Sequence, residues 1–148
     1  MKSAIIYASH HHGNTEKIVK YLAQQHEIDL ICAEQIVTSD MLSYDLIGFA
    51  SGIDFGKMYP CVTEAAKNVP TGKKIYALYT CAKDQQRYGT EIEEIAVRNG
   101  CVYLGKFGCK GYNTYGPLKI IGGMNRLHPD IDDFAAANAF YEKLINIV

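Results

Sequence analysis

The chain has 148 residues, 48% of them hydrophobic and 21% charged, with 15 Lys or Arg against 16 Asp or Glu. This length fits one domain with a sizeable core, so we expect residues 1–148 to form a single domain. A formal charge of −1 gives no electrostatic reason to expect nucleic acid or an anionic membrane as a partner. No apolar run approaches the ~18 residues that span a bilayer, and no cleavage pattern follows the first apolar run, so we expect no membrane segment and a cytoplasmic location.

The cysteines are odd in number and none is spaced as Cys-x-x-Cys, which argues against a disulfide framework and against common zinc or thioredoxin motifs. We therefore expect reduced thiols at all five positions, namely Cys32, Cys61, Cys81, Cys101 and Cys109.

Short β-branched and aromatic runs alternate with helix-period stretches along the chain. This alternation predicts a doubly wound α/β fold, in which helices cover both faces of a five-stranded parallel sheet. The predicted strands are residues 2–8, 28–32, 46–50, 74–80 and 101–107. The predicted helices are residues 15–25, a helix opened by residues 58–60 and closed by 68–72, then 90–97 and 130–147, with a weaker turn at 40–43.

One connection, residues 105–129, is longer than ordinary loops and carries six glycines between the last strand and the last helix. Its interleaved Tyr112, Tyr115 and Leu118 favour an ordered, functional loop over a disordered one.

A phosphate-binding pattern follows the first strand, where free backbone N–H groups and the helix dipole attract anions. Hydroxyl and amide side chains can donate to a phosphate there, and glycine permits close backbone approach. No Gly-Lys-Ser/Thr or Gly-x-Gly-x-x-Gly motif is present. The residues concerned are Ser9, His10, His11, His12, Gly13, Asn14 and Thr15.

This segment resembles the phosphate loop of the flavodoxin family, Ser/Thr-x-x-x-Gly-Asn-Thr, and the resemblance extends over nearly the whole chain. It implies strand order 2-1-3-4-5 and FMN held by its phosphate at Ser9, Gly13, Asn14 and Thr15. The alternative is a capped helix without a ligand, which Asn14 and Thr15 alone satisfy. We expect the three histidines to bind no metal, because adjacent side chains point in different directions; beside a phosphate they would hold a proton more readily.

By the same resemblance, the segments after the third and fourth strands contact the flavin ring, because ligands of such sheets bind outside the carboxyl ends of the strands. The residues after the third strand are Ser51, Gly52, Ile53, Asp54, Phe55 and Gly56. Those after the fourth strand are Thr80, Cys81, Ala82 and Lys83; this segment departs from the family pattern because it lacks glycine.

The expected function is electron transfer by FMN between redox partner proteins, with no catalytic side chain, in a monomer or homodimer. A flavin-dependent quinone or NAD(P)H oxidoreductase of the same fold stays open. A phosphatase that uses Cys81 and Arg87, with five residues between them, is a weaker alternative, because Asp84 would repel a phosphate. A receiver domain would need acidic residues where the first and third strands end, and these strands end in Ala8-Ser9 and Ala50-Ser51.

Overall fold

The computed structural model describes residues 1–148. Its strands are β1 (Ser3–Tyr7), β2 (Ile28–Cys32), β3 (Leu46–Asp54), β4 (Lys57–Met58), β5 (Lys74–Cys81) and β6 (Val102–Lys110). Its helices are α1 (Asn14–Gln25), α2 (Thr38–Met41), α3 (Pro60–Lys67), α4 (Thr90–Asn99) and α5 (Ile131–Ile147), with a 3-10 turn η1 (Gly116–Lys119). No helix combines the length and the apolar character that crossing a bilayer requires.

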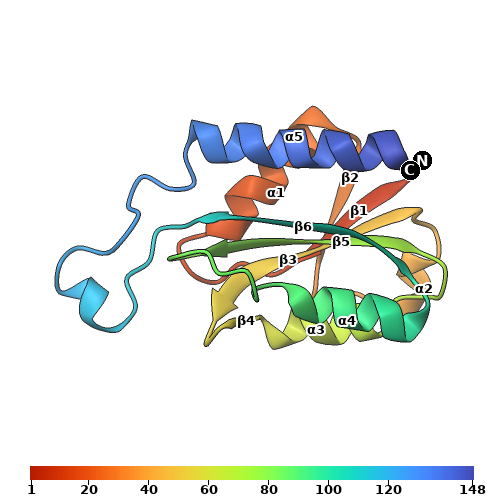
Figure 1. The fold of residues 1–148 in the computed structure, drawn as a ribbon, viewed down its shortest axis with the longest axis horizontal. Helices are drawn as coiled ribbons and strands as arrows, with labels where there is room; N and C mark the ends of the chain where they lie inside the picture. Colours follow the sequence, from red (N-terminus) through yellow and green to blue (C-terminus); the bar gives the residue numbers. More distant parts are fainter.

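The sheet runs in the order β2-β1-β3-β5-β6 with every neighbouring pair parallel, and β4 pairs antiparallel with β3. Figure 1 shows α1 and α5 on one face of the sheet and α3 and α4 on the other. The five long strands thus follow the predicted order, and the predicted doubly wound fold with helices on both faces is confirmed.

Two hydrophobic cores fill the layers between sheet and helices. Ile6 and Phe49 point to the α3 and α4 side, and Ile5 and Leu78 to the α1 and α5 side. Because side chains alternate across a strand, central strands need apolar residues at nearly every position. Strand β5 meets this requirement, with seven of its eight residues buried.

Two strands run further than predicted. Strand β3 continues to Asp54, so residues expected in a loop form a hairpin with β4 through the pairs Ile53 with Met58 and Asp54 with Lys57. Phe55 and Gly56 make the turn with φ angles of 49° and 79°, in the left-handed region that tight turns use. The residue Met58, expected at a helix start, therefore lies in β4, and α3 begins at Pro60.

Strand β6 likewise extends to Lys110, so Gly105 and Gly108 belong to the strand rather than to the following connection. The glycine at 108 reflects packing: a Cβ there would lie 2.2 Å from the ring of Tyr79. What remains of the long connection is Gly111, at its base, and residues 112–129, which we call the lobe. It projects beyond the carboxyl edge of the sheet, at the left of Figure 1.

Candidate functional site

The β1–α1 segment (residues 9–15) presents free hydrogen-bond donors at the start of a helix. His12 and Gly13 are consecutive left-handed residues, with φ angles of 54° and 65°. The backbone N–H groups of His12, Gly13 and Thr15 donate to no group of the chain. Since a helix N-terminus carries a partial positive charge, these donors form a site suited to an anion.

Three hydroxyl groups, those of Ser9, Thr15 and Thr80, support this segment. The Oγ of Ser9 accepts a hydrogen bond of 3.1 Å from the backbone N–H of Glu16 and so satisfies a donor of the first helical turn. The hydroxyls of Thr15 and Thr80, both buried, lie 2.9 Å apart. Only one of the two donates within that pair, so the accepting hydroxyl keeps its own hydrogen for a third group.

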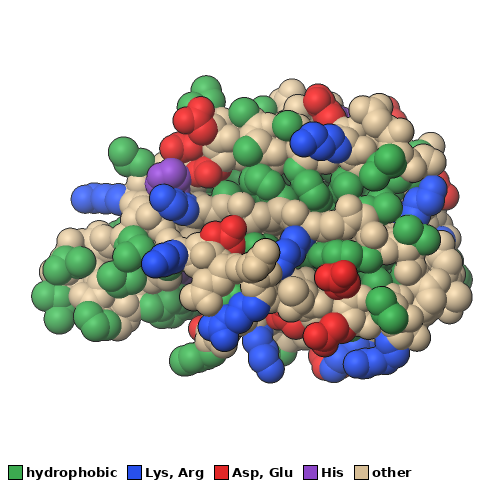
Figure 2. Space-filling view, viewed as in Figure 1, with side chains coloured by type: hydrophobic (Ala, Val, Ile, Leu, Met, Phe, Trp, Pro, Cys, Tyr) green, Lys and Arg blue, Asp and Glu red, His purple; other side chains and the backbone are tan.

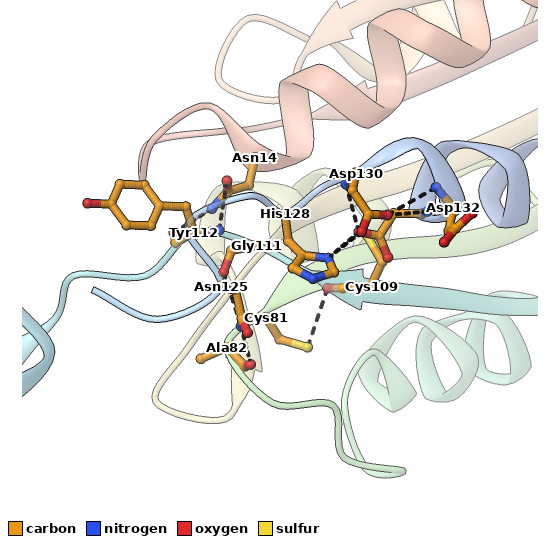
Figure 3. A network of polar contacts seen from close by, with 11 residues as sticks. Asn14, Cys81, Ala82, Cys109, Gly111, Tyr112, Asn125, His128, Asp130 and Asp132 are labelled. Atoms are coloured by element: carbon orange, nitrogen blue, oxygen red, sulfur yellow. Dashed lines mark hydrogen bonds and ion pairs between the residues drawn. The ribbon is translucent and has the colours of Figure 1, made fainter. Parts of the chain in front are cut away.

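The amide of Asn14 is directed away from the free donors and toward the lobe. It donates to the carbonyl of Tyr112 at 2.8 Å and accepts from the N–H of the same residue at 3.1 Å. Figure 3 shows this paired contact between α1 and the start of the lobe. A Cβ at Gly111 would lie 2.7 Å from the Asn14 amide nitrogen, so glycine there permits the close approach. Asn14 therefore ties the lobe to the sheet.

The rings of the three histidines pack against three different tyrosines, that of His12 against Tyr112 with the ring centroids 4.1 Å apart. The ring of His10 stacks on Tyr59 at 5.0 Å, and its Nε2 lies 3.5 Å from a carboxylate oxygen of Glu34. His11 stacks on Tyr115 at 4.0 Å. All three rings thus pack against aromatic side chains, and those of His11 and His12 also lie 4.2 Å apart, centroid to centroid.

Two of the histidines also hydrogen-bond to the lobe through Thr114. The Nε2 of His11 accepts the Thr114 backbone N–H at 3.1 Å, and the Nε2 of His12 lies 2.8 Å from the Thr114 hydroxyl. Burial, together with the neighbouring His12, lowers the pKa of His11, although Asp54 acts in the opposite direction. The neutral ring that this favours is the form that can accept a hydrogen bond at Nε2.

Two adjoining cavities lie at this edge of the sheet. The first, about 20 Å³, is lined by the β1–α1 segment, and the second, about 570 Å³, lies between the β3–β4 turn and the loop after β5. Five residues line both cavities: Ile53, Cys81, Ala82, Asn113 and Tyr115. The larger volume lies within the usual range for small-molecule sites, whereas the smaller one holds about one water molecule.

The structure brings together most of the residues that the sequence singled out. Those lining the two cavities are Ser9, His11, Asn14, Thr15, Gly52, Ile53, Asp54, Phe55, Gly56, Thr80, Cys81, Ala82 and Lys83. Ser51 lines neither cavity: its buried hydroxyl donates to the Gly52 carbonyl and accepts from the Tyr59 N–H. His10, His12 and Gly13 also lie outside the lining, although the last two contribute the free N–H groups described above.

Four lining residues of the lobe and its base were not among the predicted site residues, namely Gly111, Tyr112, Asn113 and Tyr115, and Gly116 joins them in the larger cavity. The sequence carries one signal for them, which is the interleaving of tyrosines with glycines in a long connection. That signal predicts an ordered segment but does not give its direction relative to the sheet.

Phosphatase chemistry at Cys81 finds no support in its surroundings. Burial, and secondarily Asp84, raises the pKa of the Cys81 thiol to about 12. The thiol donates to the Cys109 carbonyl at 3.6 Å, and the guanidinium of Arg87 bonds the Gln85 side chain instead of facing the sulfur. A nucleophilic cysteine needs a lowered pKa, so this thiol is inert.

Two other features fall outside the site. The largest hollow, about 830 Å³, lies at the opposite end of the sheet beside Met1 and residues 24–29. His128, Asp130 and Asp133 lie close enough to share an ion, but their oxygens already cap α5: Asp130 accepts from the N–H groups of Asp132 and Asp133. This group is a helix cap in which His128 bonds Asp133 at 2.6 Å (Figure 3).

Comparisons with known proteins agree with this architecture. No protein-family model matches the chain. The flavodoxin of Streptococcus pneumonia TIGR4 superimposes with a TM-score of 0.69 at 16% identity, over 100% of both chains. Oxidised Flavodoxin 2 of Bacillus cereus gives a TM-score of 0.69 at 22% identity, over 97% of this chain and 99% of that one. The chain is therefore a flavodoxin-like α/β protein.

Sequence comparison places it more narrowly. Uncharacterized protein MJ0298 of Methanocaldococcus jannaschii is 36% identical over 148 residues, which cover 98% of this chain and 99% of that protein. The chain belongs to the family of this archaeal protein.

Proposed function

We propose that the chain binds FMN at the carboxyl edge of its sheet and serves as an electron carrier between redox partners. The observation that carries the proposal is that an anion site and a ligand-sized cavity lie at the same edge of the sheet. Thr15, one of the three residues with free donors, lines the smaller cavity, and five residues that line this cavity also line the larger one. A ligand in which a phosphate monoester is joined to a flat ring system requires both an anion site and a cavity of this size.

The residues present fit such a group. The phosphate would accept from the free N–H groups at the start of α1 and from a hydroxyl of the Thr15 and Thr80 pair. The ring would lie in the cavity of about 570 Å³, between the β3–β4 turn and the Cys81–Ala82 backbone. When bound, FMN supplies electron transfer, which no amino-acid side chain of the site provides.

Accommodation of the phosphate requires the lobe to shift locally. Tyr115 lines both cavities and stacks on His11, so its ring occupies the passage between the two spaces. Tyr115 is 50% exposed, and its stack on His11 is an interaction of modest strength, about 0.5–1.5 kcal/mol. A tightly bound ligand can therefore displace this ring at a small cost in free energy.

Phe55 borders the outer side of the same cavity. It stands fully exposed at the tip of the β3–β4 turn and lines the larger cavity beside Asp54 and Gly56. An aromatic ring with no packing partner loses little by turning onto a flat ligand. We expect it to cover the ring of the bound cofactor.

The test is the absorption spectrum of the purified chain after incubation with FMN and removal of free flavin. Retained flavin bands in stoichiometric amount support the proposal, and their absence contradicts it. After reduction, rapid oxidation by a one-electron acceptor protein supports a carrier. Sustained turnover of NAD(P)H with a quinone would instead identify an enzyme with its own substrate.

A further inference from the structure

The lobe exposes large aliphatic side chains to a degree unusual for a small protein. Ile120, Ile121 and Leu127 are 88%, 75% and 85% exposed, and Met124 is 40% exposed. Figure 2 shows hydrophobic side chains gathered on the projecting lobe, at the left of the view. Gathered exposed apolar side chains, unlike scattered ones, mark surfaces that bind a partner.

This exposure is built into an anchored segment. The side-chain amide of Asn125 donates to the Ala82 carbonyl at 2.6 Å and to that of Gly111 at 3.4 Å. The Tyr112 N–H donates to the His128 carbonyl at 3.1 Å, which closes the base of the lobe (Figure 3). Because these bonds fix both ends of the lobe, its tip is held away from the protein's own cores.

The charge of the lobe selects the kind of partner. From Lys110 to Pro129 the sequence holds no acidic residue, and Lys110, Lys119 and Arg126 are exposed. A second copy docked by the same face would bring these cations against their own copies. Anionic membranes attract clusters of 4–8 basic residues, and the lobe has fewer. An acidic protein surface complements the lobe better than either alternative.

The position of the lobe links this surface to the site. Tyr115 and Gly116 of the lobe line the cavity assigned to the flavin ring. A protein seated on the lobe therefore lies beside that cavity, where electrons have a short distance to travel.

We propose that residues 115–127 form the docking surface for an acidic electron-carrier protein, with the aliphatic tip as its apolar centre and Lys119 and Arg126 at its rim. The role as an electron-transfer surface rests on the proposed function. The docking itself is a property of the lobe and can be measured with or without flavin.

The experiment titrates the ¹⁵N-labelled chain, flavin-free and FMN-loaded, with an acidic plant-type [2Fe–2S] ferredoxin, while amide shifts are recorded. We expect shifts concentrated in residues 115–127 and affinity that falls as salt rises. The double variants Lys119→Glu with Arg126→Glu, and Ile120→Ser with Ile121→Ser, should each weaken binding about tenfold. The charge-matched control, Arg98→Glu with Lys143→Glu, changes exposed residues away from the lobe and should bind as the wild type does.

Several outcomes would overturn the inference. Absence of shifts in the lobe at any salt concentration would do so, as would equal weakening by the control variant. Binding to phosphatidylserine vesicles without binding to ferredoxin would point to a membrane instead, and dimerisation lost in Ile120→Ser with Ile121→Ser would point to a second copy. A chain that docks ferredoxin yet takes no FMN would refute the proposed function and leave the docking surface intact.

Discussion

The β1–α1 segment and the lobe lie against each other at the carboxyl edge of the sheet, yet they are constructed differently. The first is short and its useful groups are local: the free N–H groups come from His12, Gly13 and Thr15. The lobe is long, and its position depends on contacts between residues about a hundred positions apart, such as Asn14 with Tyr112.

This difference explains why the sequence motif indicates a ligand but does not reveal Tyr115, whose ring lies between the two cavities. Residues that shape a helix start must also serve the lobe, so Asn14 and the histidines have partners that the motif alone does not reveal. The two segments form one unit, and changes in either should be felt in the other.

The largest expected effect comes from breaking the Asn14 link. Asn14→Ala leaves the carbonyl of Tyr112 without its partner, at a cost of about 1–3 kcal/mol, whereas the Tyr112 N–H keeps its bond to the His128 carbonyl. We expect the free energy of unfolding to fall by about 1–3 kcal/mol and the lobe amides to lose protection from hydrogen exchange. Chemical denaturation and exchange mass spectrometry measure the two effects.

Asn68→Ala provides the control, because the Asn68 amide bonds an exposed carbonyl of its own helix. It should change stability by less than about 1 kcal/mol and leave the lobe protected. If Asn14→Ala behaved like this control, the lobe would not depend on α1.

The next effect concerns the ligand. Thr15→Ala removes a hydroxyl from the pair with Thr80 and should weaken FMN binding by about 1.5–3 kcal/mol, the value of a hydrogen bond to a charged group. Isothermal titration of the flavin-free chain measures the change. Thr63→Ala, on α3, removes a hydroxyl that bonds only the Pro60 carbonyl, and the affinity should stay unchanged. An undiminished affinity in Thr15→Ala would place the phosphate elsewhere.

A smaller effect tests the passage between the two cavities. Tyr115→Ala removes the ring stacked on His11, so FMN no longer has to displace it. Since such a stack is worth about 0.5–1.5 kcal/mol, we expect the association rate to rise severalfold in stopped-flow fluorescence. Tyr21→Ala, which removes an aromatic pair between α1 and α5, should leave that rate as it is. A slower association in Tyr115→Ala would mean that Tyr115 guides the ligand in.

The smallest effect is pH dependence through His11. Because its folded-state pKa is lowered from about 6.5, the folded chain binds fewer protons there than the unfolded chain. Its contribution to stability is complete above about pH 6.5 and declines as the pH falls toward the lowered pKa. Protonated His11 cannot accept the Thr114 N–H, so protection factors of the lobe amides, calculated against the intrinsic exchange rate at each pH, should fall in that window.

His11→Gln should remove this pH-dependent loss of amide protection. His26→Gln changes a ring that bonds Asn138 far from the lobe, and it should retain the loss. A step that survives in His11→Gln would assign the titration to another group.

Particular residues show how much of the fold could be predicted from the sequence. The apolar runs of β1, β3 and β5 could be recognised because strands buried on both faces need apolar residues throughout. The end of β3 was placed too early, since the hairpin turn at Phe55 and Gly56 resembles an ordinary loop in composition. Gly108 resembled a loop residue because its packing against Tyr79 depends on a neighbouring strand.

The candidate site likewise contains some residues whose position could be predicted from the sequence and others whose position could not. Thr15 and Thr80 could be expected at the same edge of the sheet, because Thr80 lies at the carboxyl end of a strand and Thr15 lies at the start of the helix that follows a parallel strand. The position of Tyr115 could not be predicted, because the path of the lobe is set by Asn14 and Asn125, whose partners are distant in sequence. The role of Ser51 stays a prediction; its hydroxyl bonds the backbone in this structure, a use of serine that the sequence does not distinguish from ligand binding.

The most direct test of the central claim compares FMN with riboflavin, which lacks the phosphate, in titrations of the flavin-free chain followed by flavin fluorescence. If the β1–α1 segment holds the phosphate, FMN should bind at least about tenfold more tightly, because at least one charged hydrogen bond is lost with riboflavin. Equal affinity for the two flavins would contradict the account, since the free donors of His12, Gly13 and Thr15 would then contribute nothing to binding.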